Sequence, residues 1–203
     1  LPELRAVSPH SPYTASAGLY RRAARIARAT GAIFTTHVGE SGEEDEMFSH
    51  AAGPLFELFD RMGRDMSDCG HGGSLGLLLD ECLLPPRSLL AHLNYFNEGD
   101  LARCAAAGHA VVHCPRSHSY FGHRTFAFDA IRDAGISVSL ATDSLASCRN
   151  LSLFDEMRCF AEKHPSLKPA EVVDMVTRAP AAALGMAGDI GLIAPNADRK
   201  SVV

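Results

Sequence analysis

Histidine is the residue type with the most chemistry to offer in this sequence, which has ten histidines and no tryptophan among its 203 residues. Imidazole is the commonest metal ligand in proteins and titrates near neutral pH. Short apolar segments run into a polar residue at His37, His92, His113 and Asp143, and His10 follows another such segment. Imidazoles and a carboxylate suit zinc or iron, and a metal with an open coordination position makes water nucleophilic near neutral pH. The pattern therefore indicates hydrolytic metal chemistry.

Glu40 lies three residues after His37, within reach of an activated water whose proton it would move. Each residue taken alone also has a structural interpretation. A histidine at a strand end is often only hydrogen-bonded, and Thr142-Asp143 after a strand is a common helix cap. The recurrence of suitable residue types at successive strand ends is more specific than any one of them.

The elements that must position these residues alternate between short apolar and longer amphipathic segments, as in βα units with a parallel sheet. We expect strands at 5–8, 32–37, 88–92, 110–114 and 136–142. Helices are expected at 16–30, 48–62, 75–80, 98–107, 126–134, 153–163, 169–178 and 181–184, and a β-hairpin at 188–198. The carboxyl ends of parallel strands share one face, which carries the active site of a (β/α)₈ barrel. Five strands do not close such a barrel, so either the sheet is open or about three preceding βα units are missing.

Composition argues against several classes of function. The chain has 24 Asp and Glu against 19 Lys and Arg, a net charge of −5, so it has no basic field for nucleic acid or an anionic membrane. Its apolar runs are far shorter than the ~20 residues of a membrane span, and no signal peptide pattern opens it, so we expect a cytoplasmic protein. Six cysteines without paired spacing predict reduced thiols, and Cys114 is a poor nucleophile candidate.

Four segments together resemble the amidohydrolase superfamily, in the branch of cytosine, guanine and adenosine-like deaminases and triazine chlorohydrolases. They are Thr35-Thr36-His37-Val38-Gly39-Glu40, Leu90-Ala91-His92, Val111-Val112-His113-Cys114-Pro115 and Ala141-Thr142-Asp143-Ser144-Leu145-Ala146-Ser147. The resemblance covers 7 to about 197 and includes a helix motif at 177–185. It implies an α/β fold in which residues 1–187 are the C-terminal portion, about strands 4 to 8, of a metal-dependent (β/α)₈ barrel. Residues 188–203 would begin the return to a small β-sandwich.

The resemblance also implies roles for the strand-end residues. His37 and Asp143 are expected to bind one divalent metal ion, zinc first and iron as the alternative. Glu40 is expected to be the general acid and base, and His92 to orient or polarise the attacking water, with Asp143 sharing in catalysis. The two further ligands that this family takes from a His-x-His pair on its first strand are absent from the chain. We therefore expect activity in a parent protein about twice as large and an inactive isolated chain.

Substrate contacts are implied for a second group of residues: His10, Arg116, His118 and Ser144. His10 stands in Ser8-Pro9-His10-Ser11-Pro12-Tyr13, which resembles a substrate-contacting segment of the family, although a proline-fixed turn with a surface histidine is the alternative. Residues 113–123 are expected to line the pocket. The acidic run 43–46 is interpreted as a solvated loop and helix N-terminus, where carboxylates suit the helix dipole.

The implied function is hydrolysis of a heterocycle's C–N bond with release of ammonia. The aminodeoxyfutalosine-deaminase-like group is the best match, so the expected partners are a carboxylate-bearing adenosine-like nucleoside and water, and a homodimer is left open. The alternatives are a guanine or cytosine deaminase, a triazine-type chlorohydrolase, or an inactive fragment with structural histidines. Residues 198–203 can be encoded by the start of a common sequencing adapter, so they are either an artefactual tail or an ordinary terminus.

Overall fold

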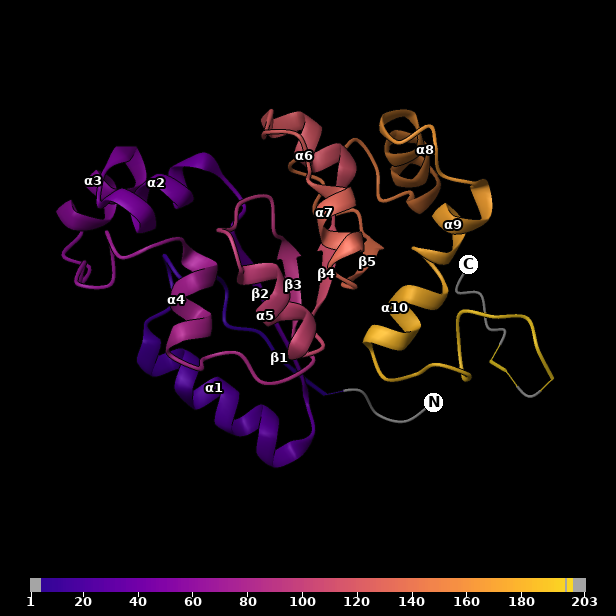
Figure 1. The fold of residues 1–203 in the computed structure, drawn as a ribbon, viewed down its shortest axis with the longest axis horizontal. Helices are drawn as coiled ribbons and strands as arrows, with labels where there is room; N and C mark the ends of the chain where they lie inside the picture. Colours follow the sequence, from indigo (N-terminus) through magenta and orange to yellow (C-terminus); the bar gives the residue numbers. More distant parts are fainter. Residues whose placement is uncertain (1–4, 196, 199–203) are drawn as a thin grey trace. The chain divides into compact units, whose positions relative to one another are not determined.

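Short strands alternate with helices in the computed structural model, which describes residues 5–195, 197 and 198 (Figure 1). The strands are β1 (Ala6–Val7), β2 (Ile33–Val38), β3 (Leu89–His92), β4 (Ala110–His113) and β5 (Ser137–Leu140). They follow one another in the sheet in chain order, and β2 pairs in parallel with both β1 and β3. The predicted α/β class with a five-stranded sheet is confirmed.

The chain divides into a larger unit, 5–111 with 123–136, and a smaller unit, 112–122 with 137–195, 197 and 198. The helices of the larger unit are α1 (Ala17–Thr30), α2 (Gly42–His50), α3 (Gly53–Arg61), α4 (Ser74–Asp80), α5 (Asp100–Ala106) and α7 (Phe128–Asp133). Those of the smaller unit are α6 (Pro115–Phe121), α8 (Leu153–Lys163), α9 (Pro169–Asp174) and α10 (Arg178–Ala183).

Helix α1 forms where the sequence predicts it. The Ser16 side chain caps its first turn by accepting the N–H of Leu19, and Gly31 closes it with a left-handed φ of 67°. Its buried residues recur with the helical period and face the strands β1 and β2: Tyr20, Ala23, Ala24 and Ala27.

The single helix predicted over 48–62 is wrong. The structure has two helices there, α2 and α3, which pack against each other (Figure 1). Ala51 takes a left-handed φ of 50° and its N–H closes the last turn on Met47 O. Pro54 then stands in the first turn of α3, where its missing N–H costs nothing, whereas inside a continuous helix it would break a hydrogen bond.

The predicted β-hairpin is not formed by 188–195, 197 and 198. These residues turn instead, with an isolated bridge between Ala187 and Ile190 and a 2.7 Å hydrogen bond from Asp198 N to Asp189 O. Ile193 is 93% exposed, so this apolar side chain packs against no neighbouring surface, and an isolated hairpin is marginal without such packing. Residues 199–203 of the predicted tail lie outside the described residues, and the domain boundary at 187 stays a prediction.

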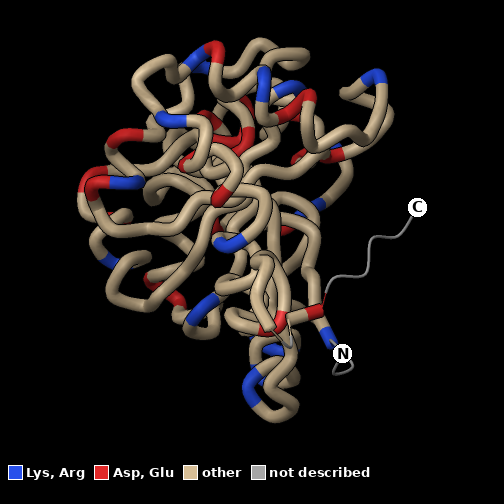
Figure 2. The backbone as a smooth tube through the Cα atoms, turned by 90° about the vertical axis from the view of Figure 1, so that its right-hand side faces the viewer, with Lys and Arg blue, Asp and Glu red and all other residues tan. Residues whose placement is uncertain are grey.

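Charge is mixed over the described chain, with Lys and Arg interspersed among Asp and Glu rather than gathered in a stripe (Figure 2). Within residues 5–195, 197 and 198, every helix is too short or too polar to span a bilayer. The cysteines in this part of the chain are free thiols, as predicted.

His109 makes the larger unit sensitive to acid. Its ring is 4% exposed, Nδ1 accepts the Ser88 N–H at 3.1 Å, and burial lowers the pKa of His109 to about 4. An unfolded histidine takes up its proton near pH 6.5, so this residue's contribution to stability is complete above that pH and is lost as pH falls towards 4, up to about 3 kcal/mol.

We expect His109→Asn to flatten this pH dependence, because the asparagine oxygen can accept the same N–H without titrating. Urea unfolding at several pH values between 7 and 4.5 measures it, with His50→Asn, an exposed residue, as the control. Equal acid sensitivity of His109→Asn and the unmodified protein would show that His109 is not the cause.

Candidate metal and catalytic site

Strand β2 presents His37 beside the turn that carries His10. Phe34, Thr36 and Val38 are buried on one face of β2, so His37 points from the other face and is half-buried. The backbone carbonyl of His10 accepts two hydrogen bonds from His37, from its N–H and from its ring Nδ1, both at 2.9 Å. A ring that donates through Nδ1 offers Nε2 as its ligand atom, which is how metal-binding histidines are usually held.

The larger unit brings four of the predicted residues together. The His37 ring centroid is 4.9 Å from that of His10 and 5.4 Å from that of His92, with the last pair stacked at 26°. His92 Nε2 lies 3.4 Å from Glu40 Oε1, and the His92 side chain is 7% exposed. These contacts connect residues at or just beyond the ends of β1, β2 and β3, and His10 and His92 are 82 positions apart, as expected for parallel strand ends.

Backbone strain marks the ends of the strands. His92 and Leu93 have φ values of 71° and 47°, and Asp143 in the smaller unit has 58°. Side-chain-bearing residues rarely adopt this left-handed region, and where they do the strain is often functional. Hydrogen bonds maintain the turn after β3, because Leu93 N–H donates to Val38 O at 3.1 Å.

Gly39 is required between His37 and Glu40. Its φ is 60°, and a side chain there would collide with the carbonyl of Tyr95. Gly39 O accepts the N–H groups of Asn94 and Tyr95 at 2.8 and 2.9 Å. The loop after β3 thus lies directly on the turn after β2, and only glycine permits this approach.

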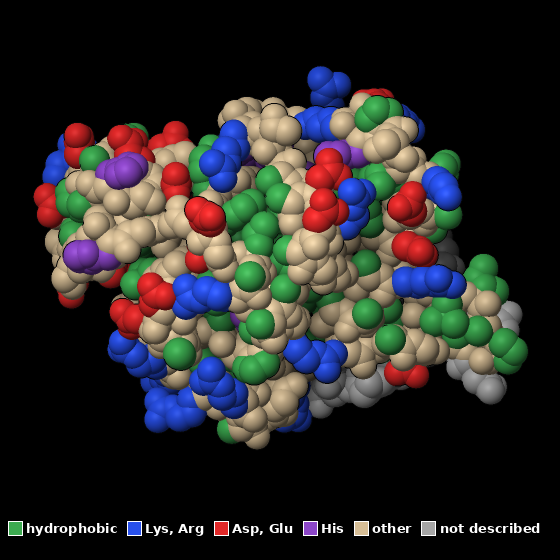
Figure 3. Space-filling view, in the orientation of Figure 1, with side chains coloured by type: hydrophobic (Ala, Val, Ile, Leu, Met, Phe, Trp, Pro, Cys, Tyr) green, Lys and Arg blue, Asp and Glu red, His purple; other side chains and the backbone are tan. Residues whose placement is uncertain are grey.

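The acidic run is partly misjudged by sequence. Glu43 and Glu46 are exposed, and Figure 3 shows acidic side chains over the α2–α3 region, as expected for a helix N-terminus. Glu44, however, is fully buried, so it is not a solvated residue. Burial raises the pKa of Glu44, and hydrogen bonds from Ser74 and from the backbone of Glu40 and Gly39 oppose that shift. One residue of the run faces inward because successive helix positions point in different directions.

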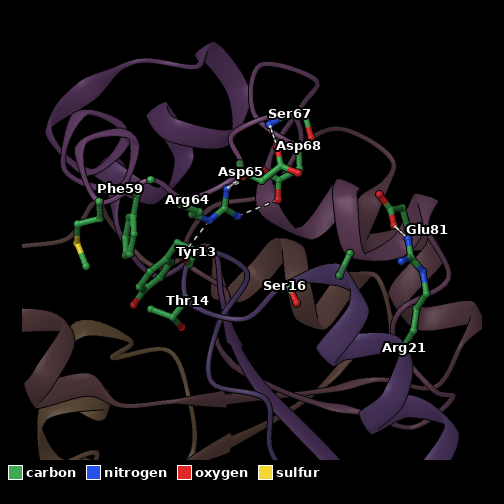
Figure 4. Close-up of a pocket in the computed structure, with 13 residues that line it drawn as sticks. Tyr13, Thr14, Ser16, Arg21, Phe59, Arg64, Asp65, Ser67, Asp68 and Glu81 are labelled. Atoms are coloured by element: carbon green, nitrogen blue, oxygen red, sulfur yellow. Dashed lines mark hydrogen bonds and ion pairs between the residues drawn. The ribbon is translucent and has the colours of Figure 1, made fainter.

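Arg64 fixes the turn that carries His10. It donates to the carbonyls of Tyr13 and Pro12 at 3.1 and 3.0 Å and pairs with both oxygens of Asp68 at 2.8 Å (Figure 4). Tyr13, Arg64 and Asp68 are among the residues that line a cavity of about 570 Å³. His10 itself is exposed, with Nδ1 2.7 Å from Thr14 Oγ1. Desolvation lowers the pKa of His10, and the neighbouring His37 lowers it further.

Asp143 in the smaller unit is held by two serines. Its Oδ2 accepts the hydroxyls of Ser117 at 2.6 Å and Ser147 at 2.9 Å, which leaves Oδ1 to a ligand. The helix-cap interpretation of Asp143 is wrong, because the next helix, α8, begins at Leu153 and is capped by Ser152. Sequence reasoning missed both serines as partners of Asp143, since neither has a local signal for that contact.

The other predicted substrate residues are built into the smaller unit. Arg116 lies on helix α6, which the sequence did not predict. Its Nε donates to the buried Glu156 at 2.6 Å. Its two terminal nitrogens donate to the side-chain and backbone oxygens of Asn150 at 2.9 and 2.6 Å. His118 is 7% exposed and packs on His113, with ring centroids 5.2 Å apart. Ser144 Oγ accepts the N–H of Ala146. Their substrate roles stay predictions.

Cys114 is unsuited to nucleophilic catalysis. Burial, with the charges of Asp143 and Glu156, raises the pKa of its thiol to about 12. A thiol with that pKa is almost entirely protonated at neutral pH, and the thiolate is the nucleophilic form. This agrees with the expectation that Cys114 is a poor nucleophile.

The His37 imidazole of the larger unit and the Asp143 carboxylate of the smaller unit are each a type of group that binds divalent metals. Each has one ligating atom oriented by a hydrogen bond at its other atom, and nitrogen with carboxylate oxygen is a donor set that zinc accepts. Within residues 5–195, 197 and 198, no three His, Cys, Asp or Glu side chains form a group that could hold a metal ion. The described residues thus supply part of a donor set.

Comparison with known proteins identifies relatives of the chain. An aminodeoxyfutalosine deaminase of Deinococcus radiodurans is 34% identical over 181 residues, which are 82% of this chain and 42% of that protein. The crystal structure of an aminofutalosine deaminase from Helicobacter pylori matches with a TM-score of 0.80 and 25% identity, over 95% of this chain and 49% of that one. An adenosine deaminase from Xanthomonas campestris with bound zinc matches with a TM-score of 0.70 and 25% identity, over 91% and 39%.

The chain therefore spans less than half the length of these relatives. The family assignment comes from almost the entire sequence, because the amidohydrolase family matches residues 3–198. This chain belongs to the amidohydrolase family.

Proposed function

We propose that the whole protein, in which this chain is completed to the length of its relatives, is a metal-dependent aminohydrolase of an adenosine-like nucleoside. The observation that carries the proposal is the cluster of His37, Glu40 and His92, in which the His37 ring is oriented through Nδ1 and His92 contacts Glu40 at 3.4 Å. We further propose that β1 to β5 are about strands 4 to 8 of a (β/α)₈ barrel. A cytoplasmic location and a homodimer stay predictions.

His37 Nε2 and Asp143 Oδ1 are the proposed ligands of one divalent metal ion, zinc first. When bound, such an ion activates water as a nucleophile near neutral pH. The carbonyl of His10 holds the His37 ring in place, and Ser117 and Ser147 hold the Asp143 carboxylate. These hydrogen bonds already restrict the two side chains, so less side-chain conformational entropy would be lost when they bind a metal.

Glu40 is the proposed proton carrier. It takes a proton from water and delivers it to a ring nitrogen of the heterocycle, while a C–O bond forms at the amino-bearing carbon. The new hydroxyl then gives up its proton to the amino group and becomes a carbonyl, while the C–N bond breaks and the amino group leaves as ammonia. His92, next to the Glu40 carboxylate, orients the attacking water and the leaving side of the substrate.

Substrate recognition is proposed for His10, Arg116, His118 and Ser144. His10 has the most direct support, because its ring lies 4.9 Å from that of His37 and its side chain is exposed. A carboxylate on the substrate would suit Arg116, although Glu156 and Asn150 already hold its guanidinium group.

Ammonia release by the whole protein tests this function. We expect adenosine or a 5′-substituted 5′-deoxyadenosine, including a carboxylate-bearing one, to be turned over with a kcat/KM at least about 100-fold above that of guanine or cytosine. Chloride release from a chlorotriazine is the parallel assay. Preferential turnover of guanine, cytosine or the chlorotriazine would contradict the adenosine assignment, and no turnover in either assay would contradict the hydrolase.

A further inference from the structure

The buried carboxylate of Glu44 reaches back to the turn that carries Glu40. Glu44 Oε1 accepts the N–H of Gly39 and Oε2 accepts the N–H of Glu40, both at 2.8 Å. Ser74 Oγ lies 3.3 Å from the same Gly39 nitrogen. Both oxygens of one fully buried side chain are thus used on two consecutive backbone amides.

This arrangement is not a helix cap. Ser41 is the N-cap of α2 and accepts the N–H of Glu44 itself at 3.2 Å. Glu44 instead bonds to residues that precede the helix. A buried carboxylate is expensive unless it is hydrogen-bonded, and apolar residues usually serve a core position better. The hydrogen bonds of Glu44 therefore indicate that this carboxylate maintains the conformation of the Gly39–Glu40 turn.

Asn94 holds the same turn from the opposite side. Its Nδ2 donates to Glu40 O at 2.8 Å, its backbone N–H donates to Gly39 O at 2.8 Å, and the residue is 1% exposed. Asn94 follows His92 through the strained Leu93. It therefore links the backbone of Glu40 to the strand end that carries His92.

We propose that Glu44 and Asn94 are positioning residues that fix the peptide of Glu40, and with it the placement of the Glu40 carboxylate against His92. Both peptide N–H groups and both carbonyls of Gly39 and Glu40 are bonded to the protein through these two residues and Tyr95. A proton carrier must stay within hydrogen-bond reach of its partners, and a misplacement of about 1 Å can cost 100-fold in rate. The inference rests on the role proposed for Glu40.

The test uses Glu44→Gln in the whole protein. Glutamine keeps the size and one acceptor oxygen, but its NH₂ group faces the second backbone N–H, so one bond is lost and two donors oppose each other. The matched control is Glu43→Gln, which neutralises an exposed carboxylate in the same turn of α2. We expect Glu44→Gln to lower kcat about 10- to 100-fold, with KM changed less than about threefold and zinc content unchanged. Glu43→Gln is expected to leave kcat, KM and zinc content unchanged.

A double-mutant cycle with Glu40→Gln separates positioning from general stability. If Glu44 acts through Glu40, the loss seen with Glu44→Gln should shrink below about threefold once Glu40 is glutamine. An equal fold loss in both backgrounds would overturn the proposal, as would full activity of Glu44→Gln. If Glu40→Gln itself leaves the rate unchanged, the role proposed for Glu40 fails and the premise of this inference fails with it, whereas absence of ammonia release by the unmodified protein would contradict the proposed function itself.

If Glu44→Gln does not fold, Asn94→Ala takes its place in the double-mutant cycle with Glu40→Gln, because Asn94 bonds to the turn from the opposite side. Asn94→Ala removes the donor to Glu40 O and keeps the backbone N–H of residue 94, which donates to Gly39 O. Amide hydrogen exchange at residues 39 and 40 is the second readout, and positioning predicts faster exchange there in either variant. Unchanged exchange together with unchanged kcat would overturn the proposal.

Discussion

Replacing His37 with alanine in the whole protein is expected to remove the bound zinc and to lower kcat/KM by at least about 10³-fold. His37 Nε2 is the proposed ligand atom because the ring's Nδ1 donates to the His10 carbonyl at 2.9 Å. Alanine has no donor atom, and the neighbouring rings of His10 and His92 have contacts of their own, with Thr14 and Glu40. Metal analysis after dialysis, beside the ammonia assay, measures both effects.

His71→Ala is the control for the His37 variant. Its side chain is exposed in the loop before α4, and its backbone N–H bonds to Phe48 O independently of the ring. We expect one equivalent of zinc and full activity in this variant. If His37→Ala retains zinc at the same level as His71→Ala, His37 is not a ligand and the metal assignment fails.

Replacing Glu40 with glutamine is expected to leave zinc bound but to lower kcat about 10²- to 10⁴-fold. Glutamine has nearly the same shape and keeps the contact distance to His92, but it cannot accept a proton from water or deliver one to the substrate. The backbone bonds of Glu40 to Glu44 and Asn94 do not involve its side chain, so the turn should keep its structure. Steady-state kinetics with zinc analysis distinguish this variant from His37→Ala.

Glu46→Gln, an exposed carboxylate on α2, provides the control for the loss of charge. We expect its kcat to stay within about twofold of the unmodified protein. A Glu40→Gln protein with nearly full activity would exclude Glu40 as the proton carrier. A Glu40→Gln protein that has lost its zinc would show that the residue maintains the metal site instead.

Local sequence signals were sufficient for most of the secondary structure. The expected strand 32–37 is β2 at Ile33–Val38, and the expected helix 16–30 is α1 at Ala17–Thr30. Apolar runs, a serine cap and a closing glycine act over a few residues, so they can be read directly. The predictions failed for the helix α6 and the absent hairpin, where the outcome depends on neighbouring segments. They also failed at the break between α2 and α3, where Pro54 was a local signal that the helical pattern of 48–62 obscured.

The sequence by itself determined which groups are available for chemistry: imidazole and carboxylate groups at strand ends, with Glu40 three residues after His37. Neighbouring parallel strands bring His10, His37 and His92 together although they stand far apart in the chain. Only the tertiary structure decided which groups support them. Glu44 faces inward, Asn94 bonds to a carbonyl 54 residues away, and Ser117 bonds to Asp143 across 26 residues. Contacts between residues so far apart produce no periodic pattern in the sequence, because they depend on how loops pack in space and not on the repeat of a helix or strand.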